Sequence, residues 1–268
     1  MSERTSYEPG TPSWVELSGT PDVDAAEAFY RDLLGWEIPE QPNSAELGGY
    51  RRAQLNGRDV AGVMGKMDDS QPTVWATYVS VEDADATLAK VRDAGGTVIV
   101  ETMDVMGMGK MAVFSDQAGA VIGLWEPGSF AGAELVNEDG AFSWNELGTR
   151  DVEGSIDFYG KVFGWTVEEQ DMGPMGTYRI WKDGTDGVRG GLFDLSGHDI
   201  PDETPNHWLV YFTVPDANAA AATTKAAGGT VLNGPIDIGM GEIAILRDPQ
   251  GATFAVMAPT DETRESAA

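Results

Sequence analysis

The feature that most constrains the fold is a long stretch that occurs twice in the chain. Residues 13–36 begin with Ser-Trp-Val-Glu-Leu, continue through Phe-Tyr and end in Gly-Trp. Residues 143–165 repeat this order as Ser-Trp-Asn-Glu-Leu, Phe-Tyr and Gly-Trp, about 130 residues further on. A self-match at a fixed long offset indicates that a whole domain is duplicated, and 268 residues are enough for two domains with cores of their own.

Each domain in turn contains two similar units. In the first, residues 13–18 read as a strand, and a helix follows with Thr20 as its predicted N-cap and Gly35 at its end. A second strand, helix and set of strands fill residues 73–126. The second half of the chain repeats the markers of this unit, since 210–217 match 77–84, 227–231 match 94–98 and 248–252 match 116–120. The sequence therefore predicts an α+β protein made of four βαβββ modules.

The repeat also places the domain boundaries. We expect one domain at residues 12–127 and a second at 140–258. Residues 128–139, which are rich in small and acidic side chains, are predicted to be a linker. Residues 1–11 and 259–268 are predicted to be flexible tails.

Composition excludes several classes of function. The net charge of −27, without a cluster of Lys and Arg, argues against nucleic acid as a partner. No apolar run is long enough for a membrane span, and the first residues lack the apolar core of a signal peptide, so a cytoplasmic location is expected. The chain has no cysteine, which removes disulfides and thiolate chemistry.

The order of these motifs resembles that of the vicinal oxygen chelate superfamily, which includes glyoxalase I, bleomycin-resistance proteins and extradiol dioxygenases. The markers are Phe-Tyr on the first helix, Gly-Trp at its end, Ala-Gly-Gly-Thr-Val after the second helix and Asp-Pro-Gln-Gly near the close. The resemblance covers residues 12–258, in particular with two-domain actinobacterial members, some of them linked to antibiotic gene clusters. It implies two tandem glyoxalase/bleomycin-resistance-like domains, each curled into a cup with a ligand inside.

In metal-using members of that family, His on the first strands and Glu on the last strands hold a divalent cation. Carried over by motif spacing, these places fall on residues that bind no metal. The first-strand places are Trp14, Ala76, Trp144 and Leu209, and the last-strand places are Gly62, Gly123, Gly191 and Ala255. The resemblance thus predicts a lost metal site and no cofactor, unless Glu16 or Glu146 with His207 supplies shifted ligands.

Side chains alternate across a strand, so Trp14 and Glu16 are expected to face the cup, with Val15 and Leu17 facing the helices. The same alternation turns Trp144 and Glu146 inward in the second domain. Small residues on the floor and aromatic residues on the walls indicate a pocket for a flat apolar molecule. The predicted ligand-binding residues are Trp14, Glu16, Tyr50, Tyr78, Met108, Trp125, Trp144, Glu146, Tyr178, His207, Leu209, Tyr211 and Met240.

The sequence leaves three functions open. The first is metal-independent binding of an apolar, aromatic small molecule for sequestration, resistance or delivery. The second is a metal-dependent lyase, isomerase or dioxygenase of the same superfamily. The third is a metal-free enzyme with Glu16 or Glu146 as general base, because burial beside an indole raises the pKa of a carboxyl group. Internal duplication fits a monomer, and a homodimer is also compatible with the sequence.

Overall fold

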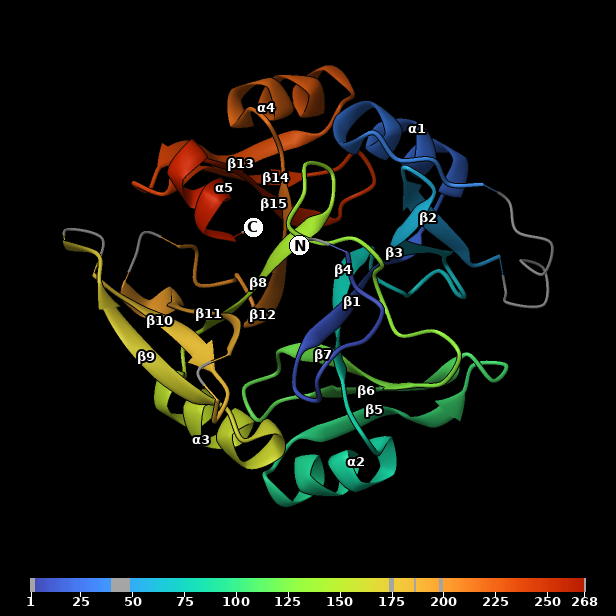
Figure 1. The fold of residues 1–268 in the computed structure, drawn as a ribbon, viewed down its shortest axis with the longest axis vertical. Coiled ribbons are helices and arrows are strands. Elements are labelled where there is room, and N and C mark those ends of the chain that lie inside the picture. Colours follow the sequence, from blue (N-terminus) through green and yellow to red (C-terminus); the bar gives the residue numbers. More distant parts are fainter. Residues whose placement is uncertain (1–2, 40–48, 174–175, 186, 198–199, 268) are drawn as a thin grey trace.

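The computed structural model describes residues 3–39, 49–173, 176–185, 187–197 and 200–267. The first domain contains β1 (Pro12–Thr20), α1 (Val23–Leu34), β2 (Arg51–Leu55), β3 (Arg58–Gly65), β4 (Val74–Ser80), α2 (Ala84–Asp93), β5 (Thr97–Asp104), β6 (Gly109–Ser115) and β7 (Val121–Pro127). The second contains β8 (Phe142–Thr149), α3 (Val152–Phe163), β9 (Thr166–Asp171), β10 (Thr177–Lys182), β11 (Val188–Asp194), β12 (His207–Thr213), α4 (Ala217–Ala226), β13 (Thr230–Asp237), β14 (Gly241–Arg247) and β15 (Thr253–Pro259). Figure 1 shows these elements in two curved sheets. The predicted α+β architecture of tandem modules is confirmed.

Each sheet is built from two consecutive modules. The first has the strand order β2-β3-β1-β4-β7-β6-β5, and the second β13-β14-β15-β12-β8-β11-β10-β9. The first strands of paired modules meet antiparallel at the centre, β1 with β4 and β8 with β12. In the first module, the described residues before β2 contribute a single bridge between Glu37 and Gln54, where the second domain has β9.

Helices α1 to α4 lie around the outside of the molecule, and each of these four contacts a helix of the other domain. Figure 1 shows α4 beside α1 and α2 beside α3. The N-cap of α1 is Asp22, whose carboxylate accepts a hydrogen bond from the backbone N–H of Ala25, so the prediction of Thr20 was wrong. A carboxylate is a strong acceptor near the positive end of a helix. Thr20 instead donates to Gln250 in the second domain.

Both chain ends contact the predicted linker. At the N-terminal end, Glu3 forms a β-bridge with Leu135, and the Tyr7 hydroxyl donates to the Ala133 carbonyl at 2.5 Å. At the other end, α5 (Asp261–Ala267) is tied down by an ion pair between Arg264 and Asp139. These contacts join segments far apart in the chain, which no local pattern reveals, and the flexibility of residues 1–11 and 259–268 stays a prediction. Residues 1, 2 and 268 of the predicted tails lie outside the described residues.

The predicted linker is also packed in part. Ala133, Leu135 and Val136 are buried. The N–H of Ala133 donates to the carbonyl of Ser13 in β1. None of the helices formed by described residues combines the length and apolar character needed to cross a bilayer.

Candidate ligand-binding site

The centre of the second sheet carries the candidate site on β8 and β12. Trp144 lies opposite Tyr211 in the antiparallel register, and Glu146 lies opposite Leu209. Leu147 and Val210, the neighbours in sequence, are fully buried on the helix side. This alternation turns the four side chains into the cup, as strand geometry predicts.

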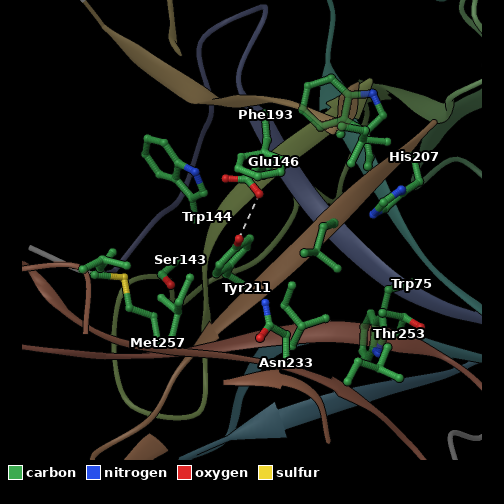
Figure 2. Close-up of a pocket in the computed structure, with 18 of the residues that line it drawn as sticks. Trp75, Ser143, Trp144, Glu146, Phe193, His207, Tyr211, Asn233, Thr253 and Met257 are labelled. Carbon is green, nitrogen blue, oxygen red and sulfur yellow. Dashed lines mark hydrogen bonds between the residues drawn. The ribbon is translucent and has the colours of Figure 1, made fainter. Parts of the chain in front are cut away.

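Three aromatic side chains organise the Glu146 carboxylate. The Tyr178 hydroxyl donates to one carboxylate oxygen at 2.6 Å, and the Tyr211 hydroxyl donates to the other at 2.9 Å. The Trp144 indole N–H in turn donates to the Tyr178 hydroxyl at 3.0 Å. Figure 2 shows Tyr211 reaching Glu146, with Trp144 beside them. The network fixes the carboxylate and leaves the indole ring as a flat wall.

Burial changes the proton affinities of this cluster. Burial raises the pKa of Glu146, and its hydrogen bonds from Tyr178 and Tyr211 act in the opposite direction. Burial also raises the pKa of both tyrosines well above the ordinary value, and the Glu146 charge adds to that effect. The tyrosines are therefore neutral donors. Glu146 can accept further hydrogen bonds or act as a base.

A cavity of about 2130 Å³ opens over this network. Its volume exceeds the roughly 300–1,000 Å³ of a typical ligand pocket, because it runs from the cup to the start of β4 and to Asn137–Asp139 of the linker. Much of its wall is apolar. The apolar lining includes Ile180, Phe193, Leu209, Leu232, Ile236, Met240, Ile243, Ile245 and Met257.

The predicted residues of the second domain all line this cavity. They are Trp144, Glu146, Tyr178, His207, Leu209, Tyr211 and Met240. Sequence reasoning missed Ile180, Ile243, Ile245 and Met257. A signal for two of them exists, because Ala244 and Leu246 are buried on the helix side of β14 and the alternation then turns Ile243 and Ile245 inward.

In the first domain, Trp14, Tyr50 and Glu16 repeat part of this network, but the predicted residues there do not line this cavity. They are Trp14, Glu16, Tyr50, Tyr78, Met108 and Trp125. Trp14 donates to the Tyr50 hydroxyl at 2.8 Å, as Trp144 does to Tyr178. Trp14 is only 4% exposed and Glu16 only 8%. Burial raises the pKa of Glu16 to about 7.

The family's metal positions do not suit a divalent cation. Gly62 and Gly191 pair with Glu16 and Glu146, and a Cβ at either glycine would collide with a tyrosine hydroxyl, that of Tyr50 or Tyr178. Tyrosine side chains thus fill the space where the family's carboxylate would project. Phenol and indole are poor donors for such ions.

The shifted ligands do not assemble either. His207 lies opposite Gly148, and its Nδ1 contacts the Pro205 carbonyl at 2.8 Å. Both oxygens of Glu146 are engaged by tyrosines. Among the side chains that the structure describes, no three of His, Cys, Asp and Glu are grouped closely enough to hold a metal ion.

Comparisons with known proteins place these observations in a family. The model of the Glyoxalase/Bleomycin resistance protein/Dioxygenase superfamily matches residues 16–124 and 141–256. "Putative glyoxylase CFP32" of Mycobacterium bovis is 40% identical over 98% of this chain and 100% of its own length. The anthracycline biosynthesis protein DnrV of Streptomyces peucetius is 36% identical over 94% of both chains.

A solved structure extends the likeness to the fold. The Mn(II)-bound glyoxalase from Novosphingobium aromaticivorans superposes with a TM-score of 0.61 at 17% identity, covering 96% of this chain and 83% of the glyoxalase. Identity this low shows a shared fold and carries no ligand residues over.

Proposed function

We propose that this chain, which belongs to the Glyoxalase/Bleomycin resistance protein/Dioxygenase superfamily, binds an aromatic small molecule in the cup of its second domain without the help of a metal ion. The observation that carries the proposal is the cluster of Trp144, Tyr178, Glu146 and Tyr211 at the floor of an apolar cavity. The place where a cation would sit in the family pattern is taken up by a hydrogen-bonded side-chain network.

The chemistry of the walls supports an aromatic ligand. Ligand pockets typically combine apolar walls with a few polar groups that set orientation. Here the Trp144 ring and the branched side chains of β14 supply the apolar surface, and Glu146 supplies a fixed acceptor. Sulfur–aromatic contacts from Met240 and Met257 suit a flat ring.

One relative supports the same class of ligand. The Streptomyces peucetius relative is named for anthracycline biosynthesis, and anthracyclines are planar polycyclic aromatic molecules. A protein that holds such a molecule can sequester it, protect the cell from it or deliver it to an enzyme. The proposal therefore covers binding in any of these settings.

Titration with an anthracycline tests the proposal. After dialysis against EDTA, the protein is expected to bind the probe with partial quenching of its tryptophan fluorescence. Trp144→Ala should weaken binding about tenfold, since an aromatic contact is worth roughly 0.5–1.5 kcal/mol beyond its buried area. Isothermal titration calorimetry measures both affinities.

Trp14→Phe is the control in the first domain, because Trp14 occupies the equivalent strand position outside the cavity. It should leave the affinity unchanged. Absence of binding across a broad panel of aromatic compounds would refute the proposal. So would a stoichiometric metal that survives dialysis and whose removal abolishes binding.

A further inference from the structure

The cup of the first domain already holds an aromatic ring, and the ring belongs to the linker. Phe130 meets Trp14 edge-to-face, with ring centroids 4.9 Å apart and planes at 89°. It contacts Trp125 in the same manner at 6.0 Å. The guanidinium carbon of Arg52 lies 5.6 Å from the centroid of the Phe130 ring. This is the environment expected for a bound aromatic ligand.

Hydrogen bonds hold the Phe130 backbone in place. The Trp125 indole N–H donates to the Phe130 carbonyl at 2.9 Å, and the Phe130 N–H donates to the Met108 carbonyl at 3.0 Å. Further along, Ala133 donates to Ser13. The linker therefore enters the first cup as a specifically bonded segment.

Strand registers identify the same positions in the second cup. Arg52 pairs with Gly62, and Ile180 pairs with the equivalent Gly191, so Ile180 stands in the place of Arg52. In the same way, Trp125 pairs with Met111, and Met257 pairs with Ile243 at the equivalent register.

Trp144 takes the place of Trp14, because each lies opposite a tyrosine on the neighbouring first strand, Tyr211 or Tyr78. Trp144, Ile180 and Met257 all line the open cavity. Each of the three side chains that contact Phe130 in the first cup therefore has a counterpart in the second cup, and that counterpart lines the open cavity.

The two domains diverge where their last strands end. The N–H of Gly128 donates to the Met108 carbonyl, and the N–H of Thr260 donates to the equivalent Met240 carbonyl. After this shared bond, the first domain continues into the segment with Phe130. The second domain instead begins α5 at Asp261, and Glu262, at the position of Phe130, is exposed.

We infer that Phe130 is a built-in ligand of the first cup, and that the second cup binds an external aromatic ring at the equivalent place, against Trp144 and between Ile180 and Met257. The protein then takes one ligand per chain. The second half of this inference rests on the proposed function, whereas the first half stands on the contacts of Phe130 alone.

The side chains around the second cup also indicate which charge on the ligand the site favours. Ile180 places no positive charge beside a ring bound in the second cup, whereas the Arg52 guanidinium lies over the Phe130 ring in the first cup. Glu146 lies on the floor of the second cup. Two arginines line the cavity, of which Arg264 is paired with Asp139 and Arg247 lies exposed at the end of β14. The site favours a neutral or cationic aromatic molecule over an aromatic carboxylate, because like charges at the floor repel.

Iodobenzene, a small aromatic probe with a strong anomalous signal, tests both halves in crystals of the full chain. Wild-type protein should show one iodine site, beside Trp144, Ile180 and Met257. Phe130→Ala should show a second site beside Trp14 and Trp125. Equilibrium dialysis should give about one equivalent of probe for wild type and about two for the variant. The second cup of the wild-type protein should bind 4-iodobenzoate about tenfold more weakly than iodobenzene.

The possible results distinguish the built-in ligand of the first cup from the proposed function of the second cup. A first-cup site in wild type, or no added site in a folded Phe130→Ala protein, would overturn the built-in ligand. A first-cup site in the variant with none in the second cup of either protein would support the built-in ligand and refute the proposed function. If Phe130→Ala does not fold, Phe130→Val replaces it with the same expectation. Phe130→Leu is the control that keeps the cup filled and should retain one equivalent.

Discussion

At the scale of single residues, Glu16 and Glu146 show how far surroundings change one side chain. Both stand two residues after a tryptophan on the first strand of a domain. Glu146 is partly exposed to the cavity and bonded by two tyrosines. Glu16 is enclosed, and burial raises its pKa from 4.5 to about 7. The same residue is thus an accessible acceptor in one cup and a buried acid in the other.

The raised pKa of Glu16 predicts a specific dependence of stability on pH. The folded state holds the proton more tightly than the unfolded state. The stability that this tighter proton binding at Glu16 contributes is therefore complete below about pH 4.5 and is lost as the pH rises through about 7. Glu16→Gln should consequently be more stable than wild type at pH 8, by up to roughly 3 kcal/mol for a shift of this size.

Urea unfolding of both proteins between pH 5 and pH 8 measures this difference. The advantage of Glu16→Gln should shrink towards pH 5. Glu82→Gln, a change at an exposed position, serves as the control and should show no such trend. A constant difference between wild type and Glu16→Gln across this range would contradict the prediction.

At the scale of elements, the repeated turns at Asp116 and Asp248 join the two domains. One oxygen of Asp248 accepts from the backbone N–H groups of Gln250 and Ala252, and the other accepts from the Tyr30 hydroxyl on α1 at 2.9 Å. The Trp75 indole donates to that same hydroxyl at 2.9 Å.

The other turn repeats this arrangement with the domains exchanged. The Tyr159 hydroxyl on α3 donates to Asp116 at 3.1 Å and accepts from Trp208 at 2.8 Å. The Phe-Tyr motifs of the first helices and the repeated turns at 116–120 and 248–252 are therefore partners in two contacts between domains.

Removing the Tyr30 hydroxyl should weaken this contact between the domains. Tyr30→Phe leaves the Trp75 N–H and one Asp248 oxygen buried without a partner, at a cost of about 1–3 kcal/mol. Urea unfolding measures the loss. Trp75→Phe in the same background removes one of the stranded groups, so the double variant should cost less than the sum of the singles. Strict additivity would show that the hydroxyl does not link these groups.

At the scale of the whole molecule, the two domains share one aromatic core. Trp36 of the first domain is fully buried, stacks on Tyr30 at 5.3 Å and meets Phe212 of the second domain at 5.4 Å. Its indole donates to the carbonyl of Gly140 at 2.6 Å. Gly140 has a φ of 88°, and a Cβ there would collide with the backbone carbonyl of Leu34, so glycine is required.

A shared core predicts that the domains unfold together. Wild-type protein should show a single transition, with tryptophan fluorescence and binding at the second cup lost at the same urea concentration. Trp36→Ala, a change in the first domain, should lower that midpoint for both signals, with a loss of about 3–5 kcal/mol. Two separate transitions, or a shift in the fluorescence signal alone, would contradict the shared core.

The sequence by itself determined the duplicated architecture and the face of each strand. Repeats and alternation are local properties, so the positions that the family resemblance implies, carried over by motif spacing and strand alternation, assigned Trp144, Glu146, Leu209 and Tyr211 to the cup. Only the tertiary structure decided which modules pair and which cup stays open. Trp14 and Trp144 sit in nearly identical local sequences, yet Phe130 covers one of them and a cavity faces the other. That difference arises from a linker docking against strands distant in the chain, and such contacts depend on the complete three-dimensional surface rather than on any periodic pattern.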